Sequence, residues 1–209
     1  MKIKKPIFNE DFLQKKTVTI DSTITIEKAN IEGLLLDNLK IKELKIEQCL
    51  ISELSLSSSI LKEFSVTDSV LEKANFSGIE SDENYIERSE FIKSRFQGTQ
   101  FVNSIIKDVL FDKSKCISLS LRFAKIENVI FKDCDLSDSD FLGSILKNAF
   151  FINCNLTNSQ FSKTKLNNVF LSSSNIENIK IDKNVFENVT VDTSQALYLS
   201  SLFGLKIED

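Results

Sequence analysis

The chain of 209 residues contains no histidine and no tryptophan, one proline and five glycines. Without histidine it lacks the commonest general acid or base near neutral pH, which counts against an enzyme. No apolar run approaches the roughly 18 residues that a membrane-spanning helix needs. Residues 1–12 contain lysines but no apolar stretch follows them, so we expect no secretory signal there.

The chain also has few cysteines and a small net charge. The four cysteines, Cys49, Cys116, Cys134 and Cys154, are widely spaced and form no CxxC pair, so neither a zinc site nor a disulfide framework is predicted. A protein of the reducing cytoplasm is therefore expected. The 30 acidic and 26 basic residues give a net charge of −4, which does not favour a nucleic-acid binder with a basic surface.

A period of five residues dominates the rest of the chain. From Ile26 to Val191, 33 of 34 positions spaced by five are Ile, Leu, Phe, Val or Cys, and only Ser81 is polar. At 42% apolar composition, chance would give about 14 such positions. This period matches neither the 3.6 residues of a helix nor the two of a strand.

A second position of the repeat is small. Two residues before each large one, from Ser89 to Ser174, the residue is Ala, Ser, Thr, Cys or Val in every case but Leu119. We infer that a large and a small side chain point inward on each short segment. One pentad cannot bury its apolar face alone, so successive coils must stack.

Residues 134–143, CDLSDSDFLG, show the unit: small, polar, large apolar, polar, polar. These units resemble the A(D/N)Lxx pattern of bacterial pentapeptide-repeat proteins over about 170 residues. The resemblance implies an all-β fold, a right-handed quadrilateral parallel β-helix with four pentads in each coil. The 34 pentads would then form about 8.5 coils, roughly 41 Å long at about 4.8 Å per strand spacing.

The repeat divides the chain into three parts. Residues 1–23 are predicted to be an N-terminal cap segment, 24–193 the β-helix, and 194–209 a C-terminal capping helix and tail. Val18 and Ile20 suggest a strand within the first part. Caps are expected because terminal coils expose core and strand edges.

Residues 77–85 interrupt the pattern, since they include Ser81 and several acidic side chains. We predict a loop that bulges from a corner and offers a candidate contact site. Its candidate residues are Gly78, Glu80, Asp82, Glu83 and Tyr85.

The C-terminal helix has recognisable ends. Thr193 or Ser194 can cap its start, and Gly204 fits its end. The family resemblance implies that such a helix packs on the last coil or helps to form a dimer. The residues concerned are Leu197, Tyr198, Leu199, Leu202 and Phe203.

One face carries an unbroken apolar stripe when every twentieth residue is compared. The stripe consists of Leu110, Ile130, Phe150 and Phe170, each just before a large inward residue. Monomers do not usually leave such a patch open. The stripe is either a partner or dimer surface, or it is covered by an N-terminal segment that contains Phe8 and Phe12.

Two other sets of residues recur every twenty positions. Asn128, Asn148, Asn168 and Asn188 predict a structural ladder of stacked amides. Cys134 and Cys154 should lie about one strand spacing apart, within reach of a disulfide, but buried small residues are the favoured interpretation.

No catalytic residue, metal site or cofactor is predicted, and we expect a non-enzymatic protein that presents a rigid surface. The resemblance implies a specific partner. The best-characterised relatives are dimeric rods that resemble duplex DNA, bind bacterial DNA gyrase or topoisomerase IV and protect it from quinolones or peptide toxins. By this analogy the chain would be a DNA mimic with a role in antibiotic resistance.

The charge balance weighs against mimicry. Residues 86–191 contain 12 acidic side chains and 14 Lys and Arg, whereas duplex DNA carries about one negative charge per 1.7 Å. The alternative is a protein–protein interaction scaffold with an unrelated partner. In either case we expect no direct nucleic-acid binding and no membrane contact, and a homodimer is an open prediction.

Overall fold

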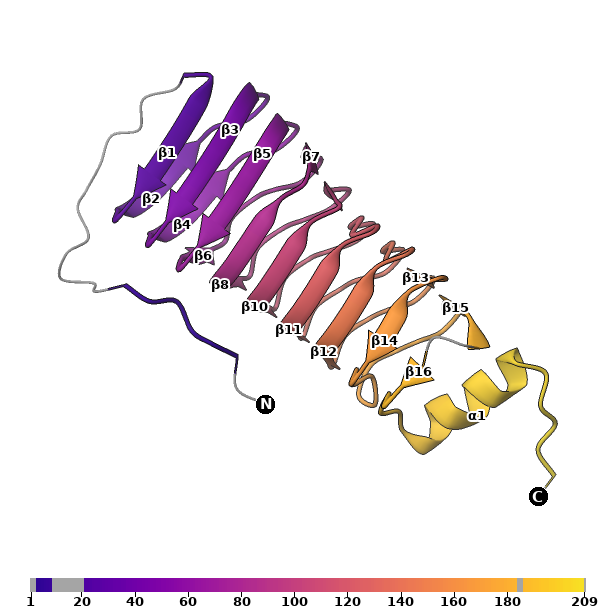
Figure 1. The fold of residues 1–209 in the computed structure, drawn as a ribbon. Coiled ribbons are helices and arrows are strands. Elements are labelled where there is room, and N and C mark those ends of the chain that lie inside the picture. The colour runs from indigo at the N-terminus through magenta and orange to yellow at the C-terminus, as the bar shows by residue number, and fades with distance from the viewer. Residues whose placement is uncertain (1–2, 9–20, 184–185, 209) are drawn as a thin grey trace.

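In the computed structural model, which describes residues 3–8, 21–183 and 186–208, the pentads stack into a parallel β-solenoid (Figure 1). Its strands are β1 (Thr23–Glu27), β2 (Asn30–Leu35), β3 (Lys40–Glu47), β4 (Leu50–Ser55), β5 (Ile60–Thr67), β6 (Val70–Glu72), β7 (Glu80–Asp82), β8 (Tyr85–Ile92), β9 (Gln100–Val102), β10 (Ile105–Asp112), β11 (Lys125–Lys132), β12 (Ile145–Ile152), β13 (Gln160–Phe161), β14 (Lys165–Asn167), β15 (Lys180–Ile181) and β16 (Phe186–Glu187). One helix, α1 (Thr193–Leu202), follows the last coil.

The corners of the coils depend on residues with a positive φ. Asn103, Asp108, Lys113, Ser118 and Phe123, spaced by five, have φ between 52° and 58°. This left-handed conformation suits glycine, asparagine and aspartate better than other residues. The position two residues after each large inward residue is therefore the corner, which explains the five-residue period.

Neighbouring coils pair in parallel with a constant offset of twenty residues. β10 pairs with β11 from Ile105 opposite Lys125 to Asp112 opposite Lys132, and β11 pairs with β12 in the same register. The offset corresponds to four pentads in each coil. The predicted fold, a four-sided parallel β-helix followed by a short helix, is confirmed.

Large inward side chains form the core. Every fifth residue from Ile26 to Ile181 is buried. On one side of the core Phe91, Phe111, Phe131 and Phe151 stack, with ring centroids 5.2, 4.7 and 5.1 Å apart. Burying one such ring contributes about 1.5–3 kcal/mol, so the stack is a major stabilising element.

Polar side chains at the small inward position form hydrogen bonds with backbone carbonyl groups. Ser139 Oγ donates to the Cys116 carbonyl at 2.9 Å, and Ser144 Oγ donates to the Leu121 carbonyl at 2.6 Å. A buried hydroxyl costs little free energy once it has such a partner. Serine and threonine can therefore occupy the same buried column as alanine and valine.

The prediction of a bulging loop at residues 77–85 is wrong. β7 pairs in register with β5 and β9, and Ser81 is buried at the usual inward position. Ser81 Oγ donates to Asn84 Oδ1 at 2.5 Å, and Asn84 Nδ2 donates to Ser104 Oγ at 2.9 Å on the next coil. Ser81 at a large inward position and Asn84 at the next small inward position are both polar, and their mutual hydrogen bonds keep the coil regular.

The two ends differ from their predictions in detail. Asp192, rather than Thr193 or Ser194, is the N-cap of α1, because its side chain accepts from the Gln195 backbone N–H at 2.9 Å. Val18 and Ile20, expected in an N-terminal strand, lie outside the described residues. Within the described part of the chain, no helix has the length and apolar character needed to cross a membrane.

Replacing Asn84 tests the packing of the corrected segment. Asn84→Ala should lower the free energy of unfolding by about 1–3 kcal/mol, because it removes the acceptor of the buried Ser81 hydroxyl. Glu80→Ala, at an exposed position of β7, should change stability by less than about 0.5 kcal/mol. Urea denaturation of both variants measures the difference, and equal stabilities would support a loop instead.

Candidate partner-binding surface

The apolar stripe lies on one face of the solenoid, where successive strands bring its members together. Leu110 is opposite Ile130 in the ladder, and Ile130 is opposite Phe150. Phe150 bridges to Phe170, and their ring centroids are 6.1 Å apart. All four side chains are half-buried, so the stripe is a contiguous surface with part of its area open to solvent.

The same column extends further than sequence reasoning found. Upstream of Leu110 it continues through Glu90 to Val70 and Leu50, all in register. The charged Glu90 interrupts the apolar pattern in the sequence and so hides this extension. An apolar column with one acidic interruption therefore runs along the solenoid from Leu50 to Phe170.

The N-terminal segment folds back along the side of the solenoid. The Ile7 backbone N–H donates to Asp68 Oδ1 at 3.0 Å, and the Lys4 backbone N–H donates to Asp108 Oδ1 at 3.3 Å. The described part of this segment is thus not placed as a cap on the first coil. The hydrogen bonds of its described residues extend no further along the solenoid than Asp108, in the coil where the stripe begins, and Phe12 lies outside the described residues.

Buried charge lies under this segment. Asp68 is 8% exposed, and Arg88 holds it with two hydrogen bonds, Nε to Oδ1 at 2.7 Å and Nη2 to Oδ2 at 2.6 Å. Arg88 also contacts Glu87. The hydrogen bond with Asp68 raises the pKa of Arg88 further above its usual range. The two hydrogen bonds orient the Asp68 carboxylate as a hydrogen-bond acceptor.

The asparagine column forms hydrogen bonds from coil to coil. Asn128 Nδ2 donates to Asp108 Oδ1 at 3.3 Å, Asn148 Nδ2 to Asn128 Oδ1 at 2.9 Å, and Asn168 Nδ2 to Asn148 Oδ1 at 2.7 Å. These residues and Asn188 all have positive φ. All four asparagines are therefore corner residues, and Asn128, Asn148 and Asn168 are also members of a side-chain ladder.

The residues assigned to a contact loop belong to a regular coil. Gly78 is a corner residue with φ 67°, and Glu83 is the next corner, with φ 55°. Glu80 and Asp82 project from β7 and are exposed. Tyr85 begins β8, where burial and a hydrogen bond with Glu87 raise its pKa. The structure brings these side chains to the solenoid surface without forming a separate site.

Cys134 and Cys154 occupy small inward positions as reduced, buried thiols. Cys134 Sγ donates to the Phe111 carbonyl and Cys154 Sγ to the Phe131 carbonyl, each at 3.3 Å. These contacts repeat the pattern of the buried serines. Both thiols thus act as small buried residues of the core.

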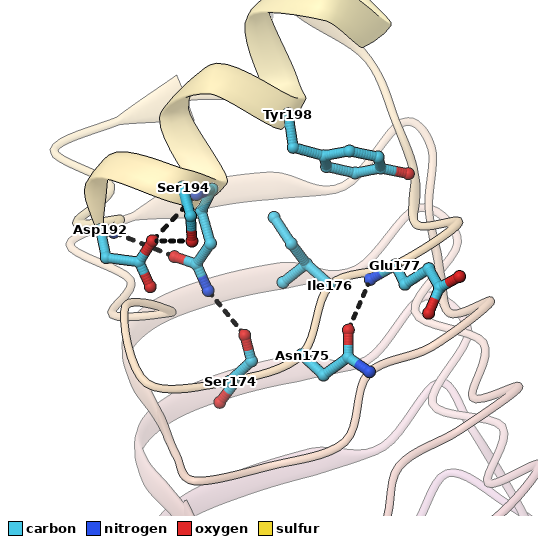
Figure 2. Close-up of a pocket in the computed structure, with 8 residues that line it drawn as sticks. Ser174, Asn175, Ile176, Glu177, Asp192, Ser194 and Tyr198 are labelled. Atoms are coloured by element: carbon cyan, nitrogen blue, oxygen red, sulfur yellow. Dashed lines mark hydrogen bonds between the residues drawn. The ribbon is translucent and has the colours of Figure 1, made fainter.

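The helix α1 covers the open edge of the last coil (Figure 2). Gln195 Nε2 donates to the carbonyls of Leu171 and Ser174 at 2.8 and 2.7 Å. Tyr198 lies above Ile176, and its hydroxyl accepts from the Asn178 backbone N–H at 2.9 Å. Polar groups that line the hollow between α1 and the last coil thus form hydrogen bonds that join the helix to the coil.

The apolar residues of α1 and of its C-cap, Phe203, divide between two sides. Leu199 is buried, Tyr198 is half-buried, and the Phe203 ring lies 5.8 Å from that of Phe186. Leu197 and Leu202 are 48% and 46% exposed. The helix therefore packs on the last coil through one side and leaves two leucines at the surface.

The described residues hold no cluster of three His, Cys, Asp or Glu side chains arranged for a metal ion. The chemistry they offer is apolar contact along the stripe and hydrogen bonding along the corner column. Both suit recognition of another polypeptide.

Comparison with known proteins agrees with the repeat. Residues 124–200 match the family model of the pentapeptide repeat region. No curated protein sequence matches the chain.

The chain is also similar to several solved structures. A trypsin-treated form of QnrB1, a plasmid-mediated fluoroquinolone resistance protein, is 15% identical and covers 87% of this chain and 100% of its own, with a TM-score of 0.45. HetL, involved in heterocyst differentiation regulation in the cyanobacterium Nostoc sp. strain PCC 7120, is 13% identical, with coverages of 79% and 86% and a TM-score of 0.30. Rfr23 from the cyanobacterium Cyanothece 51142 is 14% identical, with coverages of 80% and 91% and a TM-score of 0.24.

Substitution of Asn148 separates its two roles. Asn148→Gly retains the corner but removes the ladder amide, at a cost of about 0.5–1.5 kcal/mol per lost hydrogen bond. Asn148→Ala should cost more, because a Cβ at positive φ adds roughly 1–2 kcal/mol. Thermal unfolding compares the variants, and an alanine variant as stable as the glycine variant would contradict the assigned corner strain.

Proposed function

Because this chain is a pentapeptide-repeat protein, we propose that it acts without catalysis, as a stiff rod that binds another protein through its apolar stripe. The observation that carries this proposal is the contiguous column Leu110, Ile130, Phe150 and Phe170, whose side chains remain partly open. Large aromatic side chains in such positions are typical of energetically important contacts in protein interfaces.

Charge supports apolar recognition over mimicry of DNA. Charged side chains on neighbouring coils form ion pairs at the surface: Lys147 with Glu127 at 2.9 Å, Lys73 with Glu53 at 3.2 Å, and Lys93 with Glu72 at 3.3 Å. The hydrogen bond from Lys147 lowers the pKa of Glu127. Because acidic and basic side chains alternate in this way, the solenoid lacks the dense negative charge that duplex DNA carries.

A bacterial type II topoisomerase is the partner to test first. The resemblance to pentapeptide-repeat proteins motivates this choice, with protection of DNA gyrase or topoisomerase IV as the expected activity. The paired surface charges mean that such binding would depend on the apolar stripe and the shape of the rod. An unrelated protein partner, with the chain as a scaffold, is the alternative.

Charge placed on the stripe tests whether it joins two copies of the chain. The wild type should sediment as a dimer, and the double variant Phe150→Asp with Phe170→Asp should sediment as the 23.7 kDa monomer. Phe123→Asp is the matched control, because Phe123 is 53% exposed on another face. If the mass of the double variant stays unchanged while its stability falls, the stripe is a covered structural surface.

A supercoiling assay tests the topoisomerase candidate. Wild-type protein should alter the activity of DNA gyrase or its inhibition by ciprofloxacin, and the double variant should lose at least tenfold in potency while Phe123→Asp keeps it. No effect of the wild type on the enzyme or on the drug would remove this partner. Capture of proteins with wild type but not with the double variant would then identify the scaffold's partner.

A further inference from the structure

Residues 3–8 cross the coils in an extended conformation. Their hydrogen-bond acceptors, Asp68 and Asp108, are two coils apart, about 10 Å at strand spacing. The donors are the backbone N–H groups of Ile7 and Lys4, three residues apart, which also span about 10 Å in an extended chain. The segment therefore runs parallel to the stacking direction of the solenoid, as Figure 1 shows.

The acceptors are oriented before the segment binds. Arg88 holds Asp68 through two hydrogen bonds, and Asn128 Nδ2 donates to Asp108 from the next coil. Gln48 adds a donor, since its Nε2 bonds to the Ile7 carbonyl at 3.3 Å. All of these side chains belong to one corner column, spaced by twenty residues. The column thus offers fixed partners to the backbone of a crossing peptide.

Charge and burial also match the segment. Ile3, Pro6 and Phe8 are half-buried, whereas Lys4 and Lys5 are exposed. The carboxylates of Asp68, Asp108 and Glu87 outnumber the one guanidinium among them, that of Arg88, so this part of the column carries a net negative charge. A peptide with two adjacent basic residues between apolar ones is therefore complementary to the column.

The column continues beyond the described segment. Asn128, Asn148 and Asn168 follow Asp108, and the apolar stripe lies two residues further along each strand. Each amide nitrogen has two N–H groups, of which the ladder uses one. Asp108 Oδ2 is buried and has no hydrogen-bond partner among the described residues. Hydrogen-bonding capacity thus remains where the resident segment ends.

We propose that this corner column, from Gln48 to Asn168, is a docking track for an extended basic segment of a partner protein, which displaces residues 3–8. Backbone N–H groups of the partner bind Asp68 and Asp108, and its apolar side chains reach the stripe beyond Asp108. The inference rests on the proposed function and specifies how the partner binds. Residues 3–8 then act as an intramolecular competitor.

A peptide in trans tests the track on the full-length protein. The probe is a fluorescent peptide with the sequence of residues 1–12, and the Ile7→Pro variant lacks the N–H that Asp68 accepts. Ile7 is 64% exposed, and equal thermal stability will show that this variant stays folded. It should bind the probe at least tenfold more tightly than wild type, because the tethered segment competes at high effective concentration. Ile7→Ala, which keeps the N–H, should behave as wild type.

A second peptide identifies the contacts. The same sequence methylated on the backbone nitrogens that correspond to Lys4 and Ile7 should bind the Ile7→Pro variant at least tenfold more weakly. No binding of the probe to this variant, or equal binding of both peptides, would overturn the docking track. Partner binding that depends on Phe150 and Phe170 but not on the peptide would leave the proposed function standing and reject only this inference.

Discussion

The solenoid depends on a residue of left-handed conformation at nearly every fifth position. Each such residue turns the chain through a corner after one straight segment, so four pentads complete a coil. Only this spacing directs the large side chains of successive coils into common columns. The frequent asparagine, aspartate and glycine at corners reduce the strain of positive φ. Where lysines and a phenylalanine occupy corners instead, burial of the neighbouring inward side chains offsets that strain.

A constant offset of twenty residues turns single side chains into surfaces. Residues at equivalent positions lie one strand spacing apart, so four apolar residues become a stripe and three asparagines become a hydrogen-bonded ladder. Ion pairs form between coils for the same reason. The surface that a partner meets is therefore built from columns of residues twenty apart. A partner that runs along the rod can contact several equivalent positions in succession.

The apolar period was sufficient to predict the coils, because burial of every fifth residue leaves a direct signal. It failed at Ser81, whose hydroxyl donates to Asn84, while Asn84 donates in turn to Ser104, twenty residues further on the next coil. A rule based on hydrophobicity cannot detect such a partner. The N-cap was misplaced by one or two residues because Asp192, Thr193 and Ser194 are all good capping residues, and only the geometry distinguishes them.

The candidate surface was predictable in part. The stripe from Leu110 to Phe170 follows from comparing residues at intervals of twenty, but its extension to Leu50 is hidden by Glu90. The position of residues 3–8 has no periodic signal. Their contacts join backbone N–H groups to side chains, and any extended sequence carries the same backbone donors.

The most direct test of the account is removal of a coil with and without a change of phase. Deletion of residues 115–134 removes twenty residues and keeps every column aligned, whereas deletion of 117–134 removes nearly the same chain but shifts the phase by two. Circular dichroism during thermal unfolding should show one cooperative transition and β structure for the first deletion, and loss of both for the second. Equal behaviour of the two deletions would contradict a fold governed by stacked pentads.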